Sequence, residues 1–161
     1  MRSGGFGYLI AVAISVVVAL VLAVFPLPPH YAWFRPELLA LVCIYWALFT
    51  PFKFGVVSAW CLGLLQDVVV GGVWGAHAIG LAFIVYLCLS AYQRLRSYGL
   101  FQQMLWVFVM IGIHQVFVNW IEGLNGYNAP VIMIVLPSLV TALCWPLVIA
   151  LLKPSQPSWQ H

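Results

Sequence analysis

The chain has 161 residues, of which 65% are hydrophobic and 6% are charged, and its formal net charge is +3. A soluble domain has about 25% charged residues, so this composition excludes a water-soluble globule, a disordered chain and a collagen-like chain. Six Lys and Arg residues are too few for a nucleic-acid-binding surface, and three carboxylates leave little for acid–base catalysis. The mean hydropathy of +1.10 therefore predicts an integral membrane protein.

Six apolar stretches are predicted to form membrane helices within a single domain that covers residues 1–153. A bilayer core of ~30 Å needs roughly 20 apolar residues per helix. Four stretches meet this requirement. The second is short and the third contains Gln66 and Asp67, so these two form either two full crossings or a re-entrant hairpin. In chain order the stretches are 8–25, 37–50, 54–71, 73–92, 100–121 and 131–152.

Prolines mark several boundaries of these stretches. Pro26 closes the first stretch, Pro36 opens the second as a first-turn proline, and Pro51 ends it. Pro137 and Pro146 lie inside the last stretch and predict a kinked final helix, because neighbouring helices can satisfy the freed carbonyls. Residues 154–161 are predicted to form a flexible cytoplasmic tail.

The basic residues predict the orientation of the bundle. If the N-terminus is inside the cell, only Arg35 faces outward and the other five basic residues face the cytoplasm, which satisfies the positive-inside rule. We therefore expect an all-α polytopic membrane protein whose two termini both lie in the cytoplasm. The five cytoplasmic residues are Arg2, Lys53, Arg94, Arg96 and Lys153.

Asp67 is the polar residue that most needs an explanation. A charge at the bilayer centre costs about 2.5–3.5 kcal/mol on insertion scales, so it usually has a partner or a function. Arg35 is expected at the same outer level, and an Arg35–Asp67 ion pair would join the outer ends of two helices. The alternatives are an interfacial aspartate that reaches water, a proton or ligand site, and a contact with a partner helix.

Small residues recur every fourth position before Asp67. Gly55, Ala59 and Gly63 form a small-xxx-small seam, which lets two membrane helices approach closely. Gly71 and Gly75 repeat the spacing across an expected turn. The seam predicts close packing, either within this bundle or against a helix of another protein.

The remaining polar residues predict no catalytic or metal site. The four histidines lack the close spacing of zinc ligands, and no G-x-S-x-G, phosphate-binding loop or kinase motif is present. We therefore expect no enzymatic activity, no metal and no cofactor. Satisfied core histidines are one interpretation of this pattern. The other is a polar pocket in the outer half of the bundle, lined by Gln66, His77, His114 and Asn119.

Two motifs resemble those of the MreD family of rod shape-determining proteins. Residues 34–37 read Phe-Arg-Pro-Glu and are followed by Tyr45-Trp46, which is similar to the F-R-P…Y-W signature of that family. Residues 63–67 and 71–75 look like its second motif, in which an aspartate lies between glycines. Trp74 departs from the leucine that is more usual there. The likeness covers essentially the whole chain and includes the Trp145-Pro146 pair.

The resemblance implies a fold and a function that composition does not show. It implies a six-helix bundle similar to the substrate-binding subunits of energy-coupling-factor transporters. The implied function is a non-catalytic scaffold of the bacterial cell-elongation complex, multi-pass in the inner (cytoplasmic) membrane, which supports peptidoglycan synthesis and rod shape. The alternative is a small-molecule, vitamin-like binding subunit of a transporter.

The implied partners are MreC, through its transmembrane helix, then RodA and a class B penicillin-binding protein, with the MreB filament reached indirectly. Membrane lipids are further partners, and nucleic acid is not. Arg35, Pro36 and Asp67 are the expected outer-rim residues. The expected packing or partner-interface residues are Gly55, Ala59, Gly63, Gly71, Gly75, Tyr45 and Trp46.

Overall fold

The computed structural model describes residues 3–26, 28, 30–31, 34–126 and 130–152, so the predicted tail at 154–161 lies outside the described residues. Within the described part the chain has helices and no strand, as the sequence predicts, and forms six helices, the last broken in two at Cys144. The helices are α1 (Ser3–Val24), α2 (Leu38–Phe49), α3 (Val56–Val70), α4 (Ala76–Ser97), α5 (Leu100–Leu124), α6 (Ile132–Leu143) and α7 (Trp145–Leu152).

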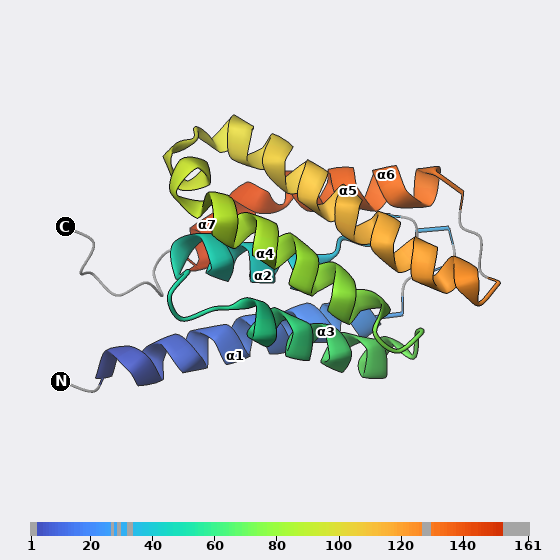
Figure 1. Ribbon diagram of the computed structural model, residues 1–161, viewed down its shortest axis with the longest axis horizontal. Helices are drawn as coiled ribbons and strands as arrows, with labels where there is room; N and C mark the ends of the chain where they lie inside the picture. The colour runs from blue at the N-terminus through green and yellow to red at the C-terminus, as the bar shows by residue number, and fades with distance from the viewer. Residues whose placement is uncertain (1–2, 27, 29, 32–33, 127–129, 153–161) are drawn as a thin grey trace.

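Successive helices run up and down the bundle (Figure 1). The start of α1 and the end of α7 lie at the same end, together with the α2–α3 and α4–α5 connections. The predicted kink in the last helix is present. Pro137 lies inside α6, and Pro146 occupies the first turn of α7, where a missing N–H is harmless.

In the described part of the chain, four helices are long and apolar enough to cross a membrane, namely Phe6–Val24, Ala76–Ser97, Leu100–Leu124 and the broken helix Ile132–Leu152. The chain is thus a multi-pass membrane protein by the length and composition of its helices. The other two, α2 and α3, have 12 and 15 residues. At 1.5 Å per residue they measure about 18 Å and 22 Å, which is shorter than the bilayer core.

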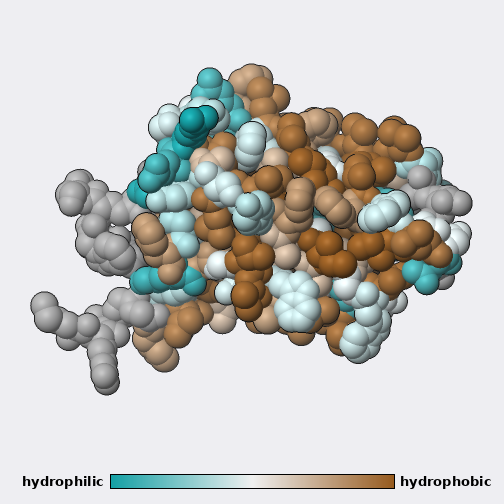
Figure 2. All heavy atoms as spheres, in the orientation of Figure 1, coloured by the Kyte–Doolittle hydropathy of each residue, from teal (hydrophilic) through white to brown (hydrophobic). Residues whose placement is uncertain are grey.

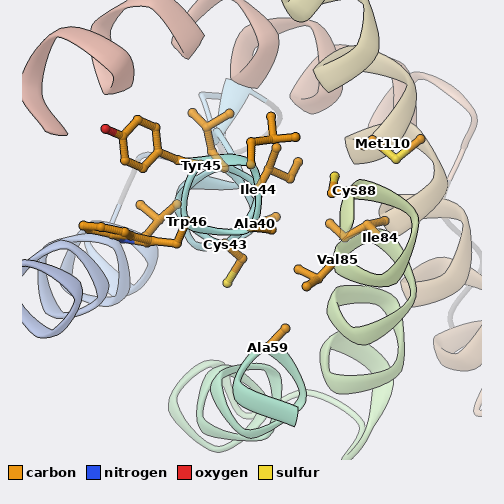
Figure 3. Close-up of a cluster of buried hydrophobic side chains, with 14 of the residues drawn as sticks. Ala40, Cys43, Ile44, Tyr45, Trp46, Ala59, Ile84, Val85, Cys88 and Met110 are labelled. Atoms are coloured by element: carbon orange, nitrogen blue, oxygen red, sulfur yellow. The ribbon is translucent and has the colours of Figure 1, made fainter. Parts of the chain in front are cut away.

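The short helix α2 forms the centre of the bundle. Every residue from Leu39 to Leu48 is buried, which is the behaviour expected of a helix that is apolar on all sides. Figure 3 shows α2 end-on, with α1, α3, α4, α5 and the last helix arranged around it. The long helices carry exposed apolar side chains on their outer faces, so α2 is enclosed by apolar helices except at a groove between α1 and α7.

Aromatic side chains fill the space around α2. The Trp46 ring packs edge-on against Tyr8 at 5.2 Å and against Tyr45 at 5.4 Å between ring centroids. Its indole N–H donates to the Ser15 hydroxyl at 3.1 Å. The buried Trp145 indole likewise donates to Oε1 of Gln103 at 3.1 Å. Trp46 and Trp145 thus each have the hydrogen-bond partner that a buried indole needs.

Hydrophilic residues gather at the two ends of the molecule, and an apolar band lies between them (Figure 2). Lys53 lies in the α2–α3 connection, and Arg94 and Arg96 lie in the last turn of α4, so these three share one end. Arg35 precedes α2 at the opposite end. Among the described residues, Arg35 is thus separated from the other basic residues, as the predicted orientation requires.

Candidate functional site

Asp67 is fully buried and caps the N-terminus of the next helix. Its Oδ2 accepts the backbone N–H of Gly75 at 2.8 Å, and that of Ala78 at 3.5 Å. Its Oδ1 accepts the backbone N–H of His77 at 3.1 Å and the Nδ1–H of the same residue at 2.8 Å. A carboxylate at this position satisfies orphan amides and complements the helix dipole, so Asp67 fixes the start of α4.

The predicted ion pair between Arg35 and Asp67 is wrong, and Asp67 does not reach water, because its side chain is fully buried. Both oxygens of Asp67 are engaged by the chain that follows its own helix, which reaches the carboxylate through one short turn. Arg35 instead points toward the end of α1, where its Nη2 lies 3.5 Å from the carbonyl oxygen of Phe25. Pro36 lies two residues before α2, and its carbonyl accepts the N–H of Leu38.

The glycines that follow Asp67 form the turn that allows this cap. Gly71 and Gly75 have φ angles of +75° and +95°, which L-residues with a side chain rarely adopt. A Cβ at either position would meet no atom within 4 Å. These two glycines are therefore turn residues whose role is conformational, and they do not form a close helix contact.

The small-residue seam of α3 faces α4 of the same bundle. A Cβ on Gly63 would collide with the backbone of Ala78, approaching its nitrogen to 2.7 Å. Ala59 is fully buried. A Cβ on Gly55, in contrast, would meet no atom within 4 Å. The seam is thus used internally at Ala59 and Gly63, which brings α3 close enough for Asp67 to reach α4.

A second polar contact centre forms around Glu37 at the start of α2. Its Oε1 accepts from Nε2 of Gln115 at 3.0 Å, and its Oε2 lies 3.4 Å from Nε2 of Gln66. Its backbone N–H donates to the Thr141 hydroxyl at 2.9 Å. One residue therefore joins α2 to α3, α5 and α6 at the end of the bundle that also holds Arg35.

Sequence reasoning missed the role of Glu37, Gln115 and Thr141. A glutamate immediately before a wholly apolar helix was the available signal, because such a carboxylate has few partners except polar side chains of other helices. Nothing in the spacing of Gln115 or Thr141 indicated that they would meet Glu37. These contacts join residues 78 and 104 positions apart in the chain.

His77 and His114 lie against each other between α4 and α5. Their ring centroids are 5.7 Å apart, and His114 is fully buried. Among the described residues neither ring nitrogen of His114 has a hydrogen-bond partner, so the expectation of a satisfied core histidine is wrong for this residue. The Asn119 amide donates to the carbonyl of Gln115 on its own helix at 2.8 Å.

The His114 ring occupies space that Gly80 leaves open. A Cβ on Gly80 would lie 2.7 Å from Cδ2 of His114. We expect Gly80→Ala to displace this ring and to lower stability by about 1–3 kcal/mol, the usual cost of overpacking. The matched control is Gly112→Ala on α5, where the new Cβ would be 4.0 Å from the nearest atom, the Ser138 hydroxyl oxygen. Thermal unfolding in detergent measures both, and equal melting temperatures would contradict the close contact.

Tyr45 and Trp46 lie in the core, with exposed fractions of 1% and 0%. Their surfaces are covered by Tyr8, Phe49 and Trp145 of the same chain. They are therefore packing residues and offer no surface to a partner. Among the described residues no group of three or more His, Cys, Asp and Glu side chains could hold a metal ion.

A groove runs along the membrane-facing side of the bundle between α1 and α7. In the described residues α1 packs on α2 and α3, and α7 packs on α2, α5 and α6, so α2 is the helix on which both walls rest. The groove between them has a volume of about 410 Å³. Its walls and floor include Ile14, Val18 and Leu22 of α1, Leu147 and Leu151 of α7, and Leu38 and Val42 of α2.

The groove presents almost no polar group. Its lining includes Ser15, but this hydroxyl donates to the carbonyl of Val12 at 2.8 Å and accepts the Trp46 indole N–H. The outer edges are strongly exposed, with Val18 at 51% and Leu147 at 61%. An occupant of this groove would thus have to be apolar along its contact face.

Two comparisons with known proteins identify the same family. The family model described as rod shape-determining protein MreD matches residues 5–154. The rod shape-determining protein MreD of Haemophilus influenzae is 28% identical over 149 residues, which cover 85% of this chain and 85% of that protein. No solved structure matches the chain, so the similarity to energy-coupling-factor subunits stays a prediction.

Proposed function

The chain belongs to the MreD family of rod shape-determining proteins, and from this premise we propose that it is a non-catalytic scaffold which holds the transmembrane helix of MreC in the groove between α1 and α7. The observation that supports this proposal is the incomplete ring of helices around α2. A further helix beside α2 would close the ring. The proposed site is the inner membrane, where the cell-elongation machinery works.

The shape of the groove suits the side of a helix. The α1 wall extends from Ala11 to Leu22, which corresponds to three turns or about 16 Å of helix. A volume of about 410 Å³ accommodates several aliphatic side chains of a partner but no whole helix. We therefore expect the MreC helix to lie on the groove and to insert one row of side chains between α1 and α7.

Affinity would come mainly from packing, because apolar burial drives little association inside lipid. Ser15 and Ala19 of the groove lining are buried against the core of this chain, so the exposed α1 residues Ile14, Val18 and Leu22 would provide most of the packing contact with the partner. Fixing MreC in the membrane plane would raise its effective concentration beside RodA and the class B penicillin-binding protein. In this scheme the chain supports peptidoglycan synthesis by positioning, and the MreB filament is reached through these partners.

Family membership does not favour the vitamin-binding alternative. The matched family is described by its role in rod shape, and that description names no catalytic activity and no small-molecule ligand. The side-chain amides of Gln66 and Gln115 donate to Glu37, and that of Asn119 donates to the carbonyl of Gln115, so these donors are already used within the chain. Support of cell shape through MreC is therefore the function to test.

The test is to fill the groove without disturbing the core. Val18→Trp and Leu147→Trp place a large ring in the groove from either wall, whereas Val116→Trp places one on the lipid-facing side of α5. Val116 is the matched control because it is 54% exposed and lies outside the groove lining. Each tagged variant is purified in mild detergent from cells that also produce MreC.

We expect the two groove variants to recover about 5- to 150-fold less MreC than wild type, since overpacking costs about 1–3 kcal/mol. The Val116 variant should recover wild-type amounts, and all three should elute and unfold like wild type. If both groove variants retained MreC fully, the groove would be excluded as its binding surface. Loss of MreC in the Val116 variant alone would move the interface to α5.

A further inference from the structure

The end of the bundle that holds the α4–α5 turn is basic, and no acidic side chain of the described residues lies there. Lys53, Arg94 and Arg96 lie at this end, and the positive-inside rule assigns it to the cytoplasm. The whole chain has three carboxylate side chains. Glu37 precedes α2, Asp67 is in the last turn of α3, and Glu122 is near the end of α5, so all three belong to the opposite end.

The two basic segments at this end are held close together. The Phe52 ring of the α2–α3 connection packs edge-on against Tyr92 of α4, with 6.3 Å between centroids. In the same connection, Nζ of Lys53 lies 5.1 Å from the centre of the Tyr8 ring. The Phe52–Tyr92 contact holds the α2–α3 connection against the last turns of α4, so the positive charges of both segments belong to the same end of the bundle. Figure 2 shows hydrophilic atoms gathered over the α4–α5 turn.

A shallow polar hollow lies next to these basic residues. It has a volume of about 360 Å³ and is lined by Ser90, Ala91, Tyr92, Gln93 and Arg94. The Gln93 amide donates to the Tyr92 hydroxyl oxygen at 3.2 Å, which leaves the proton of that hydroxyl available for an acceptor. The Arg94 guanidinium adds a fork of N–H donors suited to a phosphate.

Exposed aromatic rings lie at the same end of the bundle as the hollow, and the Phe52 ring contacts Tyr92, which lines it. Phe52 is 92% exposed, and Phe101 in the first turn of α5 is 71% exposed. Aromatic rings are favoured at the boundary between hydrocarbon and headgroups. A ligand in the hollow would therefore have its polar part beside Arg94 and its apolar part beside Phe52.

We propose that this end of the bundle is a binding site for the headgroups of anionic phospholipids, with Arg94 as the principal phosphate contact and Arg96 as a further positive charge of the same end. An anionic lipid has both features that the site requires, a phosphate for the arginines and acyl chains for the exposed rings. A zwitterionic lipid has the same chains but no net charge for the basic end to attract. Binding thus selects anionic over zwitterionic lipid and weakens as salt is added.

The experiment uses native mass spectrometry of the full chain in a neutral detergent. Phosphatidylglycerol, cardiolipin and phosphatidylcholine with matched acyl chains are titrated against wild type and against the Arg94→Gln/Arg96→Gln double variant. Wild type should retain the two anionic lipids in preference to phosphatidylcholine. The double variant should lose about fivefold in anionic-lipid affinity per charge removed, or roughly 25-fold in total.

Arg35→Gln is the matched control, because it removes one positive charge from the opposite end. It should leave the lipid preference unchanged, and all variants should show wild-type thermal unfolding. Equal affinity of wild type for anionic and zwitterionic lipid would overturn the proposal. So would an equal loss in the Arg35 variant. If lipid binding showed no preference while an acidic protein co-purified only when Arg94 and Arg96 were present, that protein and not lipid would be the ligand of this end.

Discussion

Replacing Asp67 by alanine is expected to remove most of the folded protein from the membrane. The substitution leaves the backbone amides of Gly75 and His77 and the His77 ring without an acceptor in a buried position. Breaking a buried charged pair in this way costs about 3–5 kcal/mol, which is a large part of the roughly 5–15 kcal/mol that stabilises a typical domain. Membrane levels by immunoblot and thermal unfolding in detergent measure the loss.

Two further variants separate the capping role of Asp67 from its charge. Asp67→Asn keeps one carbonyl oxygen for the start of α4 and should retain part of the stability. Glu122→Ala removes a half-buried carboxylate near the same end and should change little. Exchanging the charges of Arg35 and Asp67 should not rescue either single variant, because the two residues do not interact. A wild-type melting temperature for Asp67→Ala would contradict the cap.

Gly63→Ala is expected to separate α3 from α4. Its new Cβ would meet backbone atoms, with the Ala78 nitrogen at 2.7 Å and the His77 carbonyl carbon at 2.9 Å, and backbone cannot rotate out of the way. We expect a loss at or above the upper end of the usual range of about 1–3 kcal/mol for overpacking. Thermal unfolding in detergent gives the difference directly.

Gly55→Ala provides the control, because it adds the same methyl group to the same seam where no atom lies within 4 Å. Gly55 is the N-cap of α3, so the change should cost about 1 kcal/mol or less, the usual preference for glycine over alanine at that position. Equally small losses in both variants would contradict the close contact with Ala78. Because Gly63 also positions Asp67, the Gly63→Ala/Asp67→Ala double variant should lose less than the sum of the two single losses.

In a rod shape-determining protein, the Asp67→Ala and Gly63→Ala variants are both expected to alter cell shape. Both residues belong to the motifs that resemble the MreD signature, and both act within this chain. We therefore expect either variant to affect cell shape through lower protein levels. Groove variants should instead affect it at normal protein levels, so immunoblots distinguish a folding defect from a binding defect.

The class of this protein, its helices and its basic end are all predictable from the amino-acid sequence. Composition excludes a soluble fold, because a soluble surface needs charges that this chain lacks. The helix boundaries at Pro36 and Pro51 and the kink in the last helix are predictable, since prolines act on the backbone within one turn. The turn at 71–75 is also recognisable, because glycine acts locally on the backbone by permitting positive φ angles.

Which residues meet one another is a property of the packed helices and has no local signal. A helix that is apolar on all sides, such as α2, can face either lipid or other helices, so its pattern alone does not make it central, and no pattern indicates that a groove separates α1 from α7. The predicted partner of Asp67 was wrong because the level of a residue in the membrane does not give its direction around a helix. Glu37 meets Gln115 and Thr141 only because helices far apart in the chain pack side by side, and such distances are not encoded in any local pattern.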